Sequence, residues 1–300
     1  MLVIIEGTDC TGKSTLAERL IDATGAHLIH RGPPIRHPLE EYVLDLFPRE
    51  PRVVCDRWHL GELVWPTIYG RDSVYDDAMF NYTEAFLRSR GALVVYCAST
   101  VSAIRKRLKA RGDNTFRSEH IVPSCTLFEN VARRSTLPQL TYSIEHPVPT
   151  EAIIQRAGTL TAATKFRTYS IIGNTFDPTL LLVGDQANNG RRGVLPFMPY
   201  PSTSGHYLFG LDLDWRRVAV TNAAVDEQPQ DMRALWNQLG QPRVVALGSN
   251  ATKRLLEQDV PHGAVPHPQF VRRFHHDRAT RYRDLIVEAA DGLDLRRYEL

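Results

Sequence analysis

One stretch near the N-terminus constrains this chain more than any other part of the sequence. Residues 7–15 read Gly7-Thr8-Asp9-Cys10-Thr11-Gly12-Lys13-Ser14-Thr15. An apolar run precedes them at residues 2–5, and a segment with helical apolar spacing follows at residues 16–21. A buried strand, a glycine-rich turn and a helix in this order form the context in which the pattern G-x-x-x-x-G-K-[ST] binds polyphosphate.

The residue types in this loop suit a nucleoside triphosphate. Gly7 and Gly12 let the backbone turn so that its N–H groups point inward, above the positive end of the helix dipole. We expect all nine residues of the loop to contact ATP, with Lys13 bridging the outer phosphates as a catalytic residue. The Ser14 hydroxyl should ligate Mg²⁺. ATP and Mg²⁺ are therefore the predicted cofactors.

Length and composition set wider limits. A chain of 300 residues is long enough for two domains, and its 36 basic and 34 acidic residues nearly cancel, so partners must be argued from local sites. The four cysteines form no CxxC pair, which favours reduced thiols. We find no signal peptide and no apolar run of membrane-spanning length, so we expect a soluble protein of the cytoplasm, or of the host cytoplasm if the chain is viral.

A second polar group follows the apolar run at residues 52–55. Asp56 and Arg57 stand where this predicted strand ends, and the carboxyl ends of parallel strands line a common crevice. We therefore expect both residues beside the phosphate loop, as catalytic groups. Asp56 either ligates Mg²⁺ or accepts a proton from an attacking hydroxyl, and Arg57 grips either an acceptor phosphate or the transferring group.

Three neighbouring features leave alternatives open. The proline-rich segment 31–38 is either a phosphate-contacting loop or a solvated one, and His59 and Glu62 either face the site or do not. Tyrosines in the following segment either stack on a base or belong to the core; these are Tyr69, Tyr75 and Tyr82.

A dense run of basic residues occupies positions 102–117 and contains Arg105 and Arg111. Phosphoryl transfer needs positive charge that closes over the transferring group and excludes water, so we interpret this run as a basic lid with both arginines as catalytic residues. The Gly112-Asp113-Asn114 stretch predicts a flexible tip. The alternative is a solvated basic helix.

The phosphate loop, Asp56-Arg57 and the arginine-rich segment together resemble the thymidylate-kinase-like branch of the P-loop kinases. The resemblance covers roughly residues 1–165. It implies an α/β fold, in which helices cover both faces of a parallel sheet, and a phosphotransferase activity with ATP as donor. We place this kinase domain at residues 1–167.

A second α/β domain is expected at residues 179–300, after a linker at residues 168–178. Its four apolar runs each end in small or polar residues: 179–183, 216–220, 243–247 and 263–265. Such runs, with helical stretches between them, predict a parallel sheet with a ligand cleft along its carboxyl edge. No second phosphate loop occurs here.

The spacing of this half resembles the uracil-DNA glycosylase superfamily. The matching features are a Gly-acidic loop at 184–185, Pro-Phe and Ser-Gly at 196–197 and 204–205, Thr-Asn at 221–222, Leu-Gly-x-x-Ala at 247–251, and His-Pro at 267–268. Carried over, the resemblance implies that Asp185 activates water, that Phe197 packs on a flipped base, and that Asn222 and His267 bind the base or the DNA.

The C-terminal segment interleaves aromatic and basic side chains around Arg272 and Arg273. This pattern is typical of a surface that meets a nucleic-acid backbone and stacks on bases, although a solvated helix has the same composition. His275 and His276 are adjacent, so they do not point the same way on a helix and a zinc site is not expected.

These two halves predict one of three functions. Some bacteriophages phosphorylate the 5-hydroxymethyl group of 5-hydroxymethyluracil in DNA, with kinases that resemble thymidylate kinases, and a base-flipping fold fits such a substrate. The first alternative is a kinase for free thymidylate or another deoxynucleoside monophosphate. The second is a DNA-binding or glycosylase protein whose P-loop domain senses ATP. The predicted partners are ATP and either DNA with a modified pyrimidine or a free pyrimidine deoxynucleotide.

Overall fold

The computed structural model describes residues 1–32, 37–46, 52–112, 115–164, 170–186, 195–225 and 228–291. The predicted tip at Asp113 and Asn114 therefore lies outside the described residues, as does Arg36 of the proline-rich loop. By its internal contacts the chain forms two compact units. Unit 1 comprises residues 1–76 and 90–163, and unit 2 comprises residues 77–89 and 164–300.

Unit 1 is built on a parallel sheet. Its strands are β1 (Leu2–Glu6), β2 (His27–His30), β3 (Val53–Asp56), β4 (Ala92–Cys97) and β5 (Gln139–Tyr142). Its helices are α1 (Lys13–Thr24), α2 (Pro38–Tyr42), α3 (Trp65–Tyr69), α5 (Val101–Arg111), α6 (Ser118–Arg134) and α7 (Thr150–Ala163), with 3₁₀ turns at Leu44–Leu46 and Gly61–Leu63. The strand order is β2-β3-β1-β4-β5, and every pairing is parallel.

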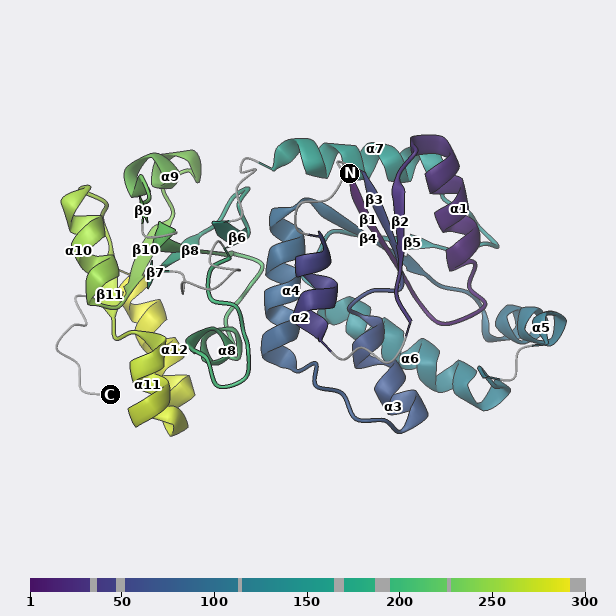
Figure 1. The fold of residues 1–300 in the computed structure, drawn as a ribbon. Helices are drawn as coiled ribbons and strands as arrows, with labels where there is room; N and C mark the ends of the chain where they lie inside the picture. The colour runs from purple at the N-terminus through teal and green to yellow at the C-terminus, as the bar shows by residue number, and fades with distance from the viewer. Residues whose placement is uncertain are drawn as a thin grey trace. The chain divides into compact units, whose positions relative to one another are not determined.

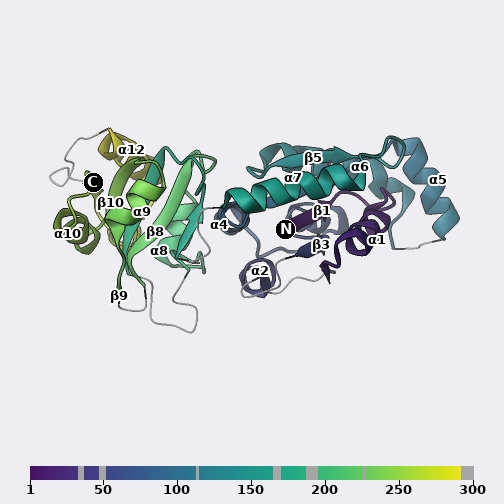
Figure 2. The same ribbon diagram turned by 90° about the horizontal axis from the view of Figure 1, so that it is seen from above.

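Side chains along the central strand β1 point alternately to the two faces of the sheet, and this explains how helices pack on it. Val3 and Ile5 of β1 point to the face on which α1 and α7 pack side by side, and Leu16 and Leu20 meet them from one stripe of α1. Figure 2 shows these two helices lying over the strands. Because β1 is buried along its whole length, it reads as a continuous apolar run in the sequence.

The strand order also places the site. From β1 the chain crosses to β2 on one side, and from β3 it crosses back over β1 to β4 on the other side. A crevice opens at the carboxyl ends of the strands where the direction of connection reverses. The loops that follow β1 and β3 meet there, as the sequence predicted.

Unit 2 contains a mixed sheet with helices. Its strands are β6 (Ile171–Gly173), β7 (Leu180–Gln186), β8 (Val218–Val225), β9 (Gln228–Pro229), β10 (Arg243–Leu247) and β11 (Gly263–Val265). Its helices are α4 (Asp77–Ser89), α8 (Ser204–Phe209), α9 (Met232–Gln238), α10 (Ser249–Glu257), α11 (Pro268–Phe274) and α12 (Ala279–Ala290), with a 3₁₀ turn at His276–Arg278. Figure 1 shows the elements of both units.

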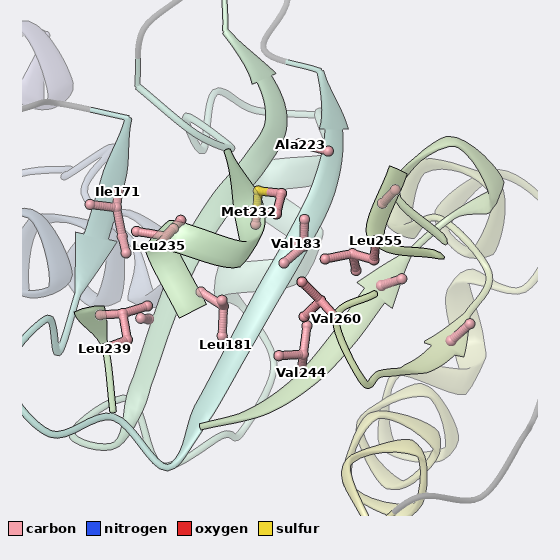
Figure 3. Close-up of a cluster of buried hydrophobic side chains, with 14 residues drawn as sticks. Ile171, Leu181, Val183, Ala223, Met232, Leu235, Leu239, Val244, Leu255 and Val260 are labelled. Carbon is pink, nitrogen blue, oxygen red and sulfur yellow. The ribbon is translucent and has the colours of Figure 1, made fainter. Parts of the chain in front are cut away.

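Four strands of unit 2 run parallel in the order β11-β10-β7-β8, while β6 and β9 pair antiparallel with β8. One face carries an apolar cluster in which Leu181 and Val183 of β7 meet Leu235 of α9 and Leu255 of α10 (Figure 3). On β11 a Cβ at Gly263 would lie 2.1 Å from the carbonyl oxygen of Ala289, so the backbone of α12 packs directly against this strand. Both units are α/β, which confirms the predicted fold class.

Two elements lie where the sequence did not place them. The short strand β6 falls inside the segment expected as a linker, and its Ile171 and Ile172 are buried against β8. Helix α4 was expected in the first domain, but it belongs to unit 2. Tyr82 of α4 packs edge-on against Phe209 with ring centroids 4.9 Å apart, and the Asn81 side-chain amide donates to the Phe209 carbonyl at 2.9 Å.

No helix in the described part of the chain combines the length and the apolar character needed to cross a membrane.

Candidate active site and candidate nucleic-acid site

The phosphate loop has the backbone that its glycines predict. Gly7 and Gly12 adopt φ values of 138° and 92°, and Cys10 between them adopts 63°. A Cβ on Gly7 would lie 2.3 Å from the Cys97 carbonyl oxygen, so the loop leaves the sheet through a passage that only glycine fits. Helix α1 begins after Gly12 without a side-chain cap, so the N–H groups of its first turn suit an anion.

Two cations converge on one carboxylate in this loop. Lys13 Nζ donates to the carbonyl oxygens of Gly7 and Thr8 at 2.8 and 2.7 Å, and it lies 3.3 Å from Asp9 Oδ1. Arg57 Nη2 lies 3.1 Å from the same oxygen. Lys13 and Arg57 are therefore adjacent at the carboxyl edge of the sheet, and two neighbouring cations suit the oxygens of a phosphate.

Ser14 and Asp56 form the pair predicted for the metal. Ser14 Oγ donates to Asp56 Oδ2 at 3.3 Å, and His30 Nδ1 lies 3.1 Å from that oxygen. Asp56 Oδ1 is buried and accepts no hydrogen bond from the described residues. A hydroxyl and an unsatisfied carboxylate oxygen are hard donors that fit Mg²⁺. Within the described residues no group of three or more His, Cys, Asp or Glu side chains is placed to hold a metal ion.

The loop after β3 is fixed by Glu6, a residue that sequence analysis missed. Glu6 Oε1 accepts hydrogen bonds from the backbone N–H groups of Trp58 and Leu60, each at 2.9 Å. Burial raises the pKa of Glu6, although these bonds and the nearby His59 oppose the shift. His59 is itself buried and does not line the cavity of unit 1. Glu6 thus holds the turn that follows Asp56.

Unit 1 contains a cavity of about 280 Å³ beside the phosphate loop. Four aromatic side chains line it, Tyr42, Trp58, Trp65 and Tyr69. Its charged lining consists of Asp9, Glu62, Arg31, Arg57, Arg71 and Arg111. Aromatic walls suit the face of a base, and guanidinium groups suit phosphate oxygens. Asp9 and Arg57 belong to both the cavity and the phosphate-loop cluster, so the cavity is directly beside the loop.

The cavity wall carries a second charged pair. Glu62 lies 3.5 Å from Arg71 and accepts a hydrogen bond from Ser73 Oγ at 3.2 Å. Burial raises the pKa of Glu62, and Arg71 opposes the shift. Trp65 and Tyr69 stack with centroids 5.8 Å apart. Of the tyrosines considered as base-stacking groups, the structure puts only Tyr69 on this wall: Tyr75 packs on Tyr42, and Tyr82 lies in unit 2.

The basic segment 102–117 was predicted to place both Arg105 and Arg111 at the site, but the structure places the two arginines differently. Arg111 lines the cavity, whereas Arg105 is exposed on α5. Arg107, which sequence analysis did not single out, donates to the Cys10 carbonyl oxygen at 2.9 Å and pairs with Glu145 at 2.5 Å. Hydrogen bonds from the hydroxyls of Ser143 and Ser99, and from Arg107, hold the pKa of Glu145 at about 2. Arg107 thus fastens α5 to the phosphate loop.

Arg31, in the proline-rich loop, contacts the same cavity. Its guanidinium pairs with Asp45 and lies 5.5 Å from the centre of the Trp58 ring, over its face. The backbone N–H of Arg31 donates to the Asp56 carbonyl oxygen at 3.2 Å. This part of the loop is therefore held against the end of β3.

In unit 2, the strand ends bring together side chains predicted for base recognition. Gly184 of β7 pairs with Asn222 of β8. A Cβ on Gly184 would lie 2.3 Å from the Phe197 ring and 2.5 Å from Asn222 Oδ1. The Phe197 ring stacks near the His267 ring, with centroids 6.2 Å apart and planes at 28°. Phe197 adopts φ = 49°, a strained value of the kind that functional sites retain.

Asp185 has the contacts of a helix cap. Its Oδ1 accepts a hydrogen bond from the Ala251 backbone N–H at 2.7 Å, and Asn250 Nδ2 lies 3.4 Å from its Oδ2. Helix α10 follows Gly248, which has no side chain of its own to cap the helix. The carboxylate of β7 therefore satisfies and neutralises the positive end of α10.

His267 caps the next helix, and its burial favours the neutral form of the ring. Its Nδ1 accepts from the Gln269 backbone N–H at 3.2 Å, so the ring proton of the neutral form sits on Nε2. Burial lowers the pKa of His267, and the Asp185 carboxylate opposes the shift. This imidazole therefore offers one N–H donor beside the Phe197 ring.

Helix α11 presents the aromatic and basic pattern on its surface. Phe270 and Phe274 are exposed, with ring centroids 5.0 Å apart. Arg273 is also exposed, and Arg272 is partly buried. Both arginines lie in the last turn of the helix.

No family model matches the chain. A curated relative, the SPbeta prophage-derived uncharacterized protein YorR of Bacillus subtilis, is 28% identical over 144 residues, which span 45% of this chain and 84% of the relative. The crystal structure of the YorR protein in complex with phosphorylated GDP aligns at a TM-score of 0.46 and 23% identity, over 54% of this chain and 96% of that one. Deoxyadenosine kinase from M. mycoides with dCMP and dCDP aligns at 0.38 and 17% identity, over 53% and 100%.

Proposed function

We propose that the protein is an ATP-dependent P-loop kinase that phosphorylates the 5-hydroxymethyl group of 5-hydroxymethyluracil in DNA. The observation that carries the kinase assignment is the shared position of Asp9 and Arg57, which belong both to the phosphate-loop cluster and to the cavity wall. Such a site brings an acceptor into contact with the end of a bound triphosphate, and phosphoryl transfer is mainly positioning and charge stabilisation.

In this proposal the residues of unit 1 have separate roles in phosphoryl transfer. The loop residues 7–15 hold the triphosphate of ATP, and Lys13 and Arg57 stabilise the charge on the transferring group. Ser14 and Asp56 hold Mg²⁺, which when bound neutralises phosphate charge. Arg111, which lines the cavity, would meet the acceptor, and the exposed Arg105 adds positive charge on α5.

The choice of DNA as acceptor is supported by unit 2. A kinase that acts on a base inside DNA needs groups that hold an extruded base, since the target atom is inaccessible in a stacked duplex. Phe197, Asn222 and His267 offer an aromatic face, an amide and a neutral imidazole donor within one cluster. Arg272 and Arg273 on α11 supply contacts to the DNA backbone. The similarity to a prophage-derived protein fits a phage modification pathway.

A kinase for free pyrimidine deoxynucleotides is the second candidate. The cavity of about 280 Å³ matches one nucleoside, and its guanidinium groups suit an acceptor phosphate. A glycosylase is less favoured, because the Asp185 carboxylate is already engaged by the start of α10.

The deciding experiment offers γ-labelled ATP and Mg²⁺ to the full-length protein with four acceptors in parallel: dTMP, 5-hydroxymethyl-dUMP, and duplex DNA with or without 5-hydroxymethyluracil. We expect label only in the hydroxymethylated DNA, and none with Lys13→Ala. Label on the free monophosphates with inert DNA would establish the second candidate instead. Release of free base would support the glycosylase.

A further inference from the structure

The cavity raises the question of which group takes the acceptor's proton. A primary alcohol must lose its proton as its oxygen attacks phosphorus, whereas a phosphate acceptor is already ionised. Two carboxylates line the cavity among the described residues, Asp9 and Glu62. We propose that Asp9 of the phosphate loop is the catalytic residue that receives this proton. The proposal rests on the proposed function, because it applies to an alcohol acceptor.

Position favours Asp9. Its Oδ1 lies 3.3 Å from Lys13 Nζ and 3.1 Å from Arg57 Nη2, the two cations that the proposed function assigns to the transferring phosphoryl group. An oxygen that attacks that group in line must approach within about 3–3.5 Å of phosphorus. The attacking hydroxyl therefore lies among the same cations, within reach of a carboxylate that contacts both. Asp9 thus belongs both to the phosphate loop and to the lining of the cavity.

The other carboxylates are committed elsewhere. Asp56 does not line the cavity, and its Oδ2 contacts Ser14 and His30 in the metal-binding pair. Glu62 contacts Arg71 and Ser73 instead. Neither of these two contacts of Glu62 involves Lys13 or Arg57.

The step balances without a further reactant. The alcohol oxygen forms a bond to the γ-phosphorus of ATP, and the bond from that phosphorus to the bridging oxygen of ADP breaks. The alcohol proton moves to Asp9, and ADP leaves with the bridging electron pair. When the acceptor departs as a phosphate ester, Asp9 returns its proton to water and resumes its contacts with Lys13 and Arg57.

The test uses Asp9→Asn in the full-length protein, because asparagine keeps the size and one acceptor oxygen but takes no proton. With the hydroxymethylated acceptor that the wild type labels, we expect kcat to fall by about 10²–10⁴-fold while ATP binding is not weakened. Asp22→Asn, the same change on an exposed residue of α1, is the matched control and should keep wild-type kcat. Glu62→Gln should instead raise KM for the acceptor more than it lowers kcat.

A second readout separates proton transfer from loop structure. If Asp9 only shapes the loop, Asp9→Asn weakens binding of a fluorescent ATP analogue in proportion to the loss of kcat, and that result overturns the proposal. Retained kcat in Asp9→Asn, or a larger kcat loss in Glu62→Gln, also overturns it. If the wild type labels no alcohol, the proposed function fails, and that outcome is visible before any variant is made.

Discussion

Each unit has a helix that begins after a glycine at the carboxyl end of a parallel strand, and the two helix starts have different surroundings. In unit 1 helix α1 follows Gly12 and has no side-chain cap, so its first N–H groups suit a phosphate. In unit 2 helix α10 follows Gly248, and Asp185 from the neighbouring strand already occupies the equivalent place. One helix start is open to an external anion, and the other is neutralised from within.

The chemistry of each site follows from this difference. Unit 1 surrounds its open helix start with Lys13 and Arg57, which suit a highly charged ligand. Unit 2 has its anion built in, and the groups beside it are an aromatic ring, an amide and a neutral imidazole. Such groups suit a flat, uncharged heterocycle. In the proposed function, the residues at the helix start, and not the sheet, distinguish the phosphate site of unit 1 from the base site of unit 2.

The largest effect is expected from a substitution in the charged site of unit 1. Lys13→Ala removes the ammonium group that contacts the loop carbonyls, and we expect phosphoryl transfer to fall by at least about 10²–10³-fold, because one charge-stabilising group has this value in other enzymes. DNA binding by unit 2 should be unchanged, as measured by fluorescence anisotropy. Equal losses of transfer and DNA binding would show that the two sites do not act separately.

The next largest effect is expected from a substitution in the uncharged site of unit 2, beside Phe197 and Asn222. Gly184→Ala places a methyl group 2.3 Å from Phe197 and 2.5 Å from Asn222, so the ring must move. We expect a loss of about 1–3 kcal/mol in the free energy of unfolding, as for other overpacked sites, together with loss of DNA binding. Gly240→Ala is the control, since its left-handed backbone is strained by a side chain but no atom lies within 4 Å. Wild-type DNA binding by Gly184→Ala would contradict the base site.

A smaller effect is expected from removing the Asp185 carboxylate at the start of α10. Asp185→Ala removes the cap of α10, and we expect a loss of about 0.5–2 kcal/mol in urea unfolding. Asp185→Asn should lose less, because it keeps the acceptor for the Ala251 N–H and gives up only the charge at the helix end. If Asp185→Asn instead abolished a base-release activity without changing stability, Asp185 would be a water-activating residue and the comparison would need to be redrawn.

The smallest effect concerns the charge of His267. Its pKa is lowered in the folded protein from an ordinary value of 6.5, so the unfolded chain takes up the proton first as pH falls. The stabilisation that neutral His267 provides is therefore complete above pH 6.5 and declines as pH falls toward the folded pKa. Imidazole NMR should show a midpoint below 6.5 with the proton on Nε2. His267→Gln should lose less stability than the wild type between pH 8 and 5.5; a midpoint above 6.5 would contradict the assignment.

Sequence predicted the parts of both sites that lie next to a recognisable pattern. The phosphate loop and Asp56-Arg57 could be placed together because parallel strand ends share an edge, and the same argument joined Asp185, Asn222 and His267. The sequence had no comparable signal for Arg107, whose partner Cys10 lies 97 positions away. Arg107 is one of several basic residues in α5, and nothing in the local sequence distinguishes it from the others. Glu6 reads as the polar end of a strand, and only the folded chain shows which N–H groups it accepts.

The predicted unit boundary differs from the structure for a related reason. A strand of three residues such as β6 is shorter than any periodicity can reveal, and its burial depends on β8, which comes almost fifty residues later. Helix α4 has the apolar pattern of any buried helix, so the pattern predicted the helix without its neighbours. Local pattern fixes the type of an element, while partners at long sequence separation decide the unit to which it belongs.

The membership of α4 in unit 2 bears on how the chain is made. Tyr82 and Asn81 emerge from the ribosome more than a hundred residues before Phe209, the residue that both contact. At about 5–20 residues per second, this helix spends several seconds without its partner. A truncated chain that stops at Ala163 lacks α8 and β6, the elements that pack on α4. The apolar side of α4 therefore stays exposed in such a chain. Residues 1–163 should therefore aggregate when expressed alone, and shortening the chain from its C-terminus should not yield a stable, isolated unit 1.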